Sequence, residues 1–279
     1  VDRTMREIHA LVPLPGYERY DLPGGLEWER ERTWAVEGIP LSAAHQGGLE
    51  EIADDEESLV DVRREDQPIN RFTIPATPYP ELVVNIESLT MMNKQHEVIA
   101  RTLTVPIEMR LGRKLLVKGP NGIGKTTLLS RLAKNEEPGA KLGENLIVGY
   151  YRQDFSSLDF SKTGYETLKE VMLEDDDERI YAAAARFHLS SKLLQHPIST
   201  YSEGQKGLLS FARFVLLAPS LLILDEPSNH INFRHLPVIA DALNDYKGAL
   251  IIVSHDETFL SRIKIDEELD LGKLRDRAI

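Results

Sequence analysis

The eight residues Gly119-Pro-Asn-Gly-Ile-Gly-Lys-Thr126, GPNGIGKT, constrain the fold of this chain more than any other stretch. They match the pattern GxxxxGK[ST] and stand between a strand pattern, KLLVK, and a helix pattern, TTLLSRLAKN. Glycines allow backbone N–H groups to curl around an anion, and the N-terminus of the following helix adds partial positive charge. The stretch therefore predicts a strand–loop–helix unit that binds phosphate groups.

Within this phosphate loop, Lys125 is expected to reach the β- and γ-phosphates of a nucleotide, and the Thr126 hydroxyl is expected to ligate Mg²⁺. A Gly-rich turn that happens to precede a lysine is the structural alternative. The residues expected to surround the phosphates are Gly119, Pro120, Asn121, Gly122, Ile123, Gly124, Lys125, Thr126 and Thr127.

From Glu81 onward, strand and helix patterns alternate along the chain. Strand patterns are LVVNIESL, IARTLTVPIEM, KLLVKG and LIVGYYRQ, and helix patterns include YETLKEVMLEDD, ERIYAAAARFHL, KGLLSFARFVLLA and HLPVIADALNDY. The runs LLILDE and ALIIVSHD are apolar throughout, which is typical of strands buried on both faces. This alternation predicts an α/β domain with a mostly parallel sheet.

Polar residues follow three of the predicted strands, at the sheet edge where α/β proteins bind ligands. Asp225 ends LLILD and would hold Mg²⁺, and the adjacent Glu226 could polarise an attacking water. Neighbouring strand residues point to opposite faces, so the chain must turn here, and Pro227 makes that plausible. Gln153 and His255 end two further strands, and each alone is uninformative.

Residues 1–80 differ from the rest of the chain. They contain 8 Lys/Arg and 17 Asp/Glu, whereas the remaining 199 residues contain 25 and 28. Pro- and Gly-rich stretches in this region disfavour long helices. Its acidic stretch, GLEEIADDEESLVDVRRED, is interpreted as a solvated helix or a flexible connector. The stretch that follows, FTIPATPYP, is predicted to be an extended linker. We therefore predict an N-terminal region of unknown role at 1–80 and a second domain at 81–279.

Composition excludes several classes of protein. The chain contains no cysteine, so it has neither disulfides nor a thiolate zinc site. Its net charge of −12 argues against broad, non-specific binding of nucleic acid. No apolar stretch approaches the roughly 18 residues that span a bilayer, so stable membrane insertion is not expected. The start, VDRTMREIHALVPL, lacks the features of a signal peptide and an initiator Met. We expect a cytoplasmic protein, and the sequence leaves open whether it is a fragment of a longer chain.

The ordered set GPNGIGKTT, Gln153, YSEGQ, LLILDEP and His255 resembles the ATP-binding cassette (ABC) family. The stretches DEPSNHIN and LNDYKGALIIVSHDETFL, and the 28 residues from Lys125 to Gln153, are most similar to its ABC-F subgroup. Those proteins are soluble and typically act on ribosomes. The resemblance covers residues 81–275. It implies a nucleotide-binding domain with a mostly parallel core sheet, an N-terminal antiparallel β portion and a helical signature subdomain.

The resemblance also implies how the site works. ATP is sandwiched between two cassettes, so YSEGQ, at Tyr201–Gln205, would serve the nucleotide of a second cassette. That cassette would be a second copy of this chain or the missing half of a longer one. The implied roles are nucleotide contact for Ser202, Gly204 and Gln205, Mg²⁺ ligation for Thr126, Gln153 and Asp225, general base for Glu226, and γ-phosphate contact for His255.

Four features depart from the family pattern. Glu203 replaces the first glycine of the signature, Asn232 stands where an Asp is usual, and MMNKQHEVIA offers no aromatic residue for adenine stacking, although His96 could substitute weakly. The chain also holds one cassette where ABC-F proteins normally have two. Two alternatives therefore stay open, namely the ATPase subunit of a membrane transporter and a weakly active regulatory cassette.

Overall fold

The computed structural model describes residues 67–95, 97–172, 174 and 176–276. Expectations that concern residues 1–66 and His96 lie outside this range. The helices and strands of the described part are β1 (Val84–Met92), β2 (Val98–Met109), β3 (Lys114–Lys118), α5 (Lys125–Ala133), β4 (Ala140–Leu142), β5 (Val148–Tyr151), α6 (Gly164–Lys169), α7 (Asp177–Arg186), α8 (Ser191–Leu194), a 3₁₀ turn (Ile198–Thr200), α9 (Glu203–Leu217), β6 (Leu221–Asp225), α10 (Leu236–Asp245), β7 (Ala249–Val253), α11 (Glu257–Leu260), β8 (Glu267–Asp270) and α12 (Leu271–Asp276).

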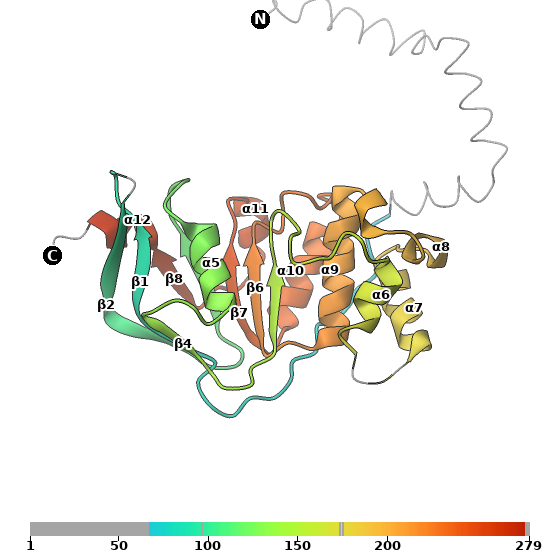
Figure 1. Cartoon of the computed structure of the whole chain (residues 1–279), viewed down its shortest axis with the longest axis horizontal. Helices are drawn as coiled ribbons and strands as arrows, with labels where there is room; N and C mark the ends of the chain where they lie inside the picture. The colour runs from blue at the N-terminus through green and yellow to red at the C-terminus, as the bar shows by residue number, and fades with distance from the viewer. Residues whose placement is uncertain (1–66, 96, 173, 175, 277–279) are drawn as a thin grey trace, which may run out of the picture. The chain divides into compact units, whose positions relative to one another are not determined.

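A five-stranded parallel sheet forms the centre of this part of the chain. Its strand order is β5-β6-β7-β3-β8, and every neighbouring pair runs parallel. The predicted parallel core is therefore confirmed, although the sequence patterns do not include β8. In Figure 1 this sheet lies between the antiparallel strands β1, β2 and β4 on one side and helices α6–α9 on the other.

The two central strands are buried on both faces, as their uninterrupted apolar sequences predict. In β6, Leu222 and Leu224 enter one hydrophobic cluster, whereas Leu221 and Ile223 enter another. The first cluster contains residues of α7, α9 and α10, and the second contains residues of α5 and the antiparallel sheet. Alternate side chains thus anchor β6 in two separate cores, which fixes the position of the residues that follow it.

The second sheet is antiparallel, with the order β2-β1-β4. Its register runs from Val84 opposite Met109 to Met92 opposite Val98, with a bulge between Ile86 and Ser88. The expected antiparallel β portion is confirmed. The sheet matters for the site because the Met92–Val98 end of the hairpin lies beside the phosphate loop, where Met92 N–H donates to the Ile123 carbonyl at 3.2 Å.

The helices α6–α9 form the expected helical subdomain, but the helix predicted over YETLKEVMLEDD is shorter than its pattern suggests. α6 ends at Lys169. Asp176, near the end of the predicted helix, instead caps α7, and its side chain accepts a hydrogen bond from the Arg179 N–H at 3.0 Å. Part of the acidic run therefore serves as the cap of the next helix rather than as helix interior, because a short carboxylate side chain competes for backbone N–H groups.

The stretch FTIPATPYP, predicted to be an extended linker, packs against the cassette instead. Its residues Phe72 and Ile74, like Ile69 just before it, are at most 4% exposed and belong to the first hydrophobic cluster. The Thr77 N–H and hydroxyl both donate to the Ala218 carbonyl at the end of α9. Prolines keep this segment out of regular structure, yet its apolar side chains find a core. The boundary near residue 80 and the linker role of FTIPATPYP stay predictions, but this stretch is packed and hydrogen-bonded rather than free of contacts.

Candidate functional site

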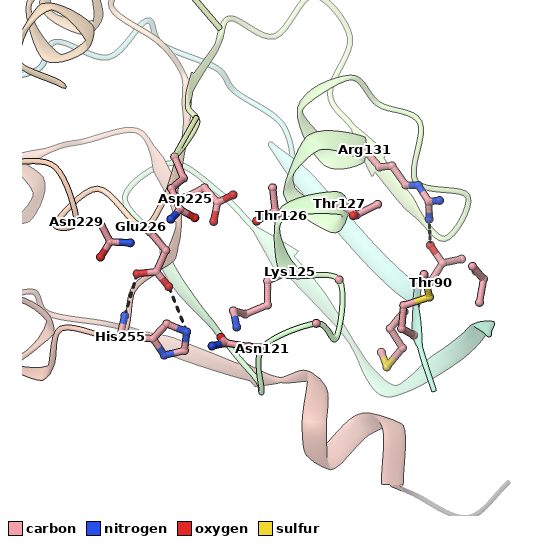
Figure 2. Close-up of a pocket in the computed structure, with 16 residues that line it drawn as sticks. Thr90, Asn121, Lys125, Thr126, Thr127, Arg131, Asp225, Glu226, Asn229 and His255 are labelled. Atoms are coloured by element: carbon pink, nitrogen blue, oxygen red, sulfur yellow. Dashed lines mark hydrogen bonds and ion pairs between the residues drawn. The ribbon is translucent and has the colours of Figure 1, made fainter. Parts of the chain in front are cut away.

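A cavity of about 550 Å³ opens along the phosphate loop. Elements from both sheets and from the carboxyl ends of the parallel strands contribute to it, as Figure 2 shows. Its lining residues are Thr90, Met91, Met92, Val98, Asn121, Gly122, Gly124, Lys125, Thr126, Thr127, Arg131, Gln153, Asp225, Glu226, Asn229 and His255.

The phosphate loop has the backbone geometry that anion binding requires. Gly122 and Gly124 have φ values of 77° and 101°, in the left-handed region that other residues rarely adopt. Gly124 is the N-cap of α5 and offers no side-chain cap, so the first N–H groups of this helix are available to a ligand. The Lys125 ammonium donates to the carbonyls of Gly119 and Pro120, at 2.8 and 3.3 Å, and thus lies over the loop.

The carboxylates Asp225 and Glu226 reach the same cavity because the chain turns between them. β6 ends at Asp225, and Glu226 has a φ of 51°, a left-handed conformation that breaks the strand alternation. This confirms the turn that the sequence requires here. The Glu226 N–H donates to the Val253 carbonyl at 2.9 Å, which ties the turn to the end of β7.

His255 meets Glu226 through two contacts, drawn as dashed lines in Figure 2. Its backbone N–H donates to Glu226 Oε2 at 3.1 Å, and its Nε2 lies 3.3 Å from Glu226 Oε1. The Glu226 side chain is 8% exposed, whereas that of His255 is 59% exposed. A nearly buried carboxylate is therefore oriented by a residue that still faces the open cavity.

Burial shifts the pKa values of two charged side chains that line the cavity, Lys125 and Asp225. Desolvation lowers the pKa of Lys125, and the negative charges of Glu226 and Asp225 oppose this shift. Desolvation likewise raises the pKa of Asp225, and the charge of Glu226 adds to the rise, while Thr126 and Lys125 oppose it. Both pKa shifts thus have the same first cause, the removal of a charged group from water.

The residues predicted to hold Mg²⁺ fit a hard cation. Asp225 Oδ2 is buried and has no hydrogen-bond partner in the described part of the chain. The hydroxyl-bearing Thr126 and the amide of Gln153 line the same cavity. Among the described residues no group of three or more His, Cys, Asp or Glu could bind a metal unaided. Such a donor set suits Mg²⁺, which keeps waters and takes ligands from substrate phosphates.

Most predicted site residues converge on the cavity. Gln153 lies two residues beyond β5, and His255 lies two residues beyond β7. Gly119, Pro120 and Ile123 belong to the loop but do not line the cavity. The signature residues Ser202, Gly204 and Gln205 are also absent from its lining.

The signature begins α9, and its side chains cap that helix. Ser202 Oγ accepts from the Gln205 N–H at 3.2 Å, while the Ser202 N–H donates to Gln205 Oε1 at 2.9 Å, which forms a capping box. Both amino acids are thus engaged locally in the described structure. Their predicted contact with a nucleotide stays a prediction.

Glu203, the departure from the family pattern, forms a contact that the sequence does not reveal. Its side chain is 68% exposed, and its Oε2 lies 2.9 Å from His230 Nδ1. The His230 ring stacks at a tilt on Phe155, with centroids 5.3 Å apart. Asn232 Oδ1 accepts from the Arg234 N–H at 3.0 Å, a contact that an aspartate could make equally well.

The sequence does not identify several lining residues, namely Thr90, Met91, Met92, Val98, Arg131 and Asn229. The stretch MMNKQHEVIA stands out in the sequence only for its missing aromatic ring. Arg131 follows Lys125 by six positions on α5, and the helix pattern gives no reason to separate it from solvated arginines. Asn229 could have been identified from the sequence only by its position shortly after β6, next to the predicted acids Asp225 and Glu226.

Comparison with known proteins agrees with this geometry. The family model described as ABC transporter matches residues 102–229. Similar proteins include ABC transporter F family member 2 of Arabidopsis thaliana, 33% identical over 65% of this chain and 26% of its own length. The probable ATP-binding protein YbiT of Escherichia coli O157:H7 is 35% identical over 56% of this chain and 30% of its own length. Residues 102–229 of this chain thus carry an ABC-type ATP-binding domain.

ABC-F proteins are among these relatives, as the sequence motifs predict. ATP-binding cassette sub-family F member 3 of Homo sapiens is 28% identical over 72% of this chain and 29% of its own length. The chain thus spans between about a quarter and a third of the length of these relatives.

Solved structures show the same fold at low identity. One is a dimeric ATP-binding cassette in a post-hydrolysis state with bound ADP and phosphate, with a TM-score of 0.53 and 18% identity over 67% of this chain and 96% of that one. Another is ABCE1 in a ribosome-bound complex with archaeal Pelota, with a TM-score of 0.54 and 21% identity over 72% of this chain and 34% of that one. No helix among the described residues is long and apolar enough to span a membrane.

Proposed function

We propose that this cassette binds and hydrolyses ATP to open and close a clamp made of two cassettes. The observation that carries the proposal is the separation of the two halves of its nucleotide chemistry. The phosphate loop, Asp225, Glu226 and His255 share one cavity, whereas Ser202 and the signature residues around it lie outside that cavity. A signature that does not line its own nucleotide site is available to the site of a second cassette.

Each side chain has a chemical task in this reaction. Lys125 neutralises charge on the β- and γ-phosphates, and the N–H groups at the start of α5 hold their oxygens. Glu226, fixed by the His255 N–H, takes the proton of the attacking water. The exposed His255 ring donates to the γ-phosphate. Thr126, Asp225 and Gln153 would hold Mg²⁺, which when bound supplies positive charge against the phosphate oxygens.

We further propose an ABC-F-like role in the cytoplasm, with the ribosome or another component of translation as the partner of the clamp. Support comes from the motif-level likeness to ABC-F proteins and from their place among the relatives. ABCE1 shares the fold and is ribosome-bound in one of the solved structures, which fits this role without specifying it.

The decisive experiment measures the solution mass of the full chain by light scattering, using the Glu226→Gln variant with and without Mg-ATP. This substitution is expected to slow hydrolysis by about 10²–10⁴-fold and to leave ATP binding intact. A doubled mass only with ATP supports a clamp of two copies of this chain. A monomer with bound ATP contradicts the homodimer and assigns the second cassette to the missing half of a longer chain.

Phosphate release by the wild-type chain tests the enzymatic step. Turnover that is unchanged in Glu226→Gln would remove Glu226 from the role of general base. Lys125→Ala serves as the control, because it should abolish nucleotide binding and thereby both dimerisation and turnover. Cosedimentation of Glu226→Gln with ribosomes in the presence of ATP, compared with Lys125→Ala, tests the partner.

A weakly active regulatory cassette is the second candidate, and the Glu203–His230 contact favours it. A carboxylate at the start of α9 adds negative charge where the signature would meet the phosphates of another cassette. Turnover that stays low even when light scattering shows a complete dimer would support this candidate over the active clamp.

A further inference from the structure

The end of the cavity remote from Glu226 and His255 has a composition of its own. In Figure 2, Thr90 and Arg131 lie on the opposite side of Lys125 from these two residues. A nucleotide whose triphosphate occupies the phosphate loop, beside the carboxylates, must place its nucleoside at this remote end. An inference about nucleobase recognition at this end rests on the nucleotide binding in the proposed function. It does not depend on the two-cassette clamp.

The remote end presents an apolar surface with no aromatic ring among its described lining residues. Met92 on β1 and Val98 on β2 are direct cross-strand partners, and Met91 adjoins them. Val98 is 60% exposed, although it is a large apolar residue. Methionine sulfur makes favourable contacts with aromatic rings, so this pair can pack against the face of a nucleobase of any identity.

Three polar residues beside this surface form one connected cluster. The Glu137 side chain, 1% exposed, accepts hydrogen bonds from the Thr90 N–H at 2.7 Å and from the Thr90 hydroxyl at 2.8 Å. Arg131 Nη1 donates to Thr90 Oγ1 at 2.5 Å and lies 3.8 Å from Glu137 Oε2. A buried carboxylate requires such partners, so Glu137 acts as a positioning residue for Arg131.

Arg131 keeps donors for a ligand. Its side chain is 36% exposed and lines the cavity, and its described contacts involve only Nη1. The Thr90 hydroxyl proton is taken by Glu137, so Thr90 offers a ligand no free donor. A guanidinium has five N–H groups and no acceptor. The polar group at this end can therefore recognise only acceptor atoms.

Acceptor recognition does not separate adenine from guanine. Both purines offer N7 as an acceptor, and guanine adds O6, whereas the adenine amino group is a donor that Arg131 cannot accept. Purines also present a larger ring face to Met92 and Val98 than pyrimidines do. We propose that this cassette binds purine nucleoside triphosphates as a class, with GTP accepted as well as ATP, through Arg131 positioned by Glu137 above the Met92–Val98 surface.

The test measures dissociation constants of ATP, GTP, UTP and inorganic tripolyphosphate by calorimetry, with Mg²⁺ and the full-length Glu226→Gln chain. We expect ATP and GTP to agree within about threefold, and UTP to bind about tenfold more weakly than either. ATP that binds more than about tenfold tighter than GTP overturns the inference.

Two variants assign the effect to residues. Val98→Ala changes an exposed side chain and should weaken ATP and GTP binding alike while leaving tripolyphosphate binding unchanged. The paired variant Arg131→Met with Glu137→Gln removes both charges together, so no buried carboxylate is left unpaired. It should weaken binding of both purines by about tenfold, again without effect on tripolyphosphate.

Three further outcomes would overturn the proposal. Equal losses for ATP and tripolyphosphate would mean that the variants damage the phosphate loop. Unaltered purine binding in the paired variant would remove Arg131 from recognition. Loss of the preference for purines over UTP in His96→Ala, with the paired variant unaffected, would assign base binding to His96. A chain that binds both purines yet never dimerises would refute a clamp of two copies of this chain and leave this inference standing.

Discussion

Substitution of Phe72 by alanine tests whether the segment before β1 is part of the cassette. The Phe72 side chain is 2% exposed, and its ring lies edge-on to Phe187 and Phe211, with centroid distances of 4.7 and 6.3 Å. Truncation of a phenylalanine in such a core destabilises a protein by about 3–5 kcal/mol, because buried surface is lost and a cavity remains. For a unit of this size, that corresponds to a fall in Tm of about 6–20 °C.

Phe233→Ala is the matched control, because it removes the same atoms from a side chain that is 73% exposed. Its effect should stay within about 0.5 kcal/mol. Both full-length variants would be unfolded thermally and in urea, with far-ultraviolet circular dichroism as the probe. Equal, small shifts in the two variants would refute the argument, since they would show that residues 69–77 contribute no packing to the fold.

Three other perturbations test separate parts of the structure. Burial, His188 and Arg234 lower the pKa of His235, whose neutral Nδ1 accepts a hydrogen bond from the Ile69 N–H. As pH falls, the unfolded chain binds a proton at this histidine before the folded chain does, so the free energy of unfolding should decrease as pH drops through about 6.5. In His235→Gln, the urea midpoint should change less with pH over that range. Glu203→Gly, made in the Glu226→Gln chain, should lower the ATP concentration at which light scattering detects dimers, whereas an unchanged midpoint would mean that the carboxylate does not face the second nucleotide. Asp225→Asn should raise the Mg²⁺ concentration needed for half-maximal phosphate release, and an unaltered Mg²⁺ profile would exclude Asp225 from the metal site.

The parts of the structure that can be predicted from the sequence are those fixed by local rules. Glycines at Gly122 and Gly124 permit the positive φ values that a loop exposing its N–H groups to an anion requires. An apolar run that ends in Asp225 and Glu226 predicts a buried strand, and adjacent acids that share a site require a turn. The structure contains that turn, with Glu226 in the left-handed region.

The parts that cannot be predicted depend on contacts between distant residues. Pro-rich composition indicates where helices and strands are absent, but it does not show that Phe72 packs against Phe187 and Phe211. The Glu203–His230 contact joins residues 27 positions apart, on a helix start and a turn. In the same way, Glu137 contacts Thr90 across 47 positions, and neither residue belongs to a recognisable motif.

The packing of β6 indicates where movement can occur during the proposed cycle. Its alternate side chains are anchored in two cores, so Asp225 and Glu226 cannot shift without disturbing the packing on both faces of the sheet. The Glu226 turn is further tied to β7 by the Val253 carbonyl. We therefore expect the catalytic half of the cassette to move as a rigid unit. The change that follows loss of the γ-phosphate must then occur outside it, between the signature end of α9 and the nucleotide site of the second cassette.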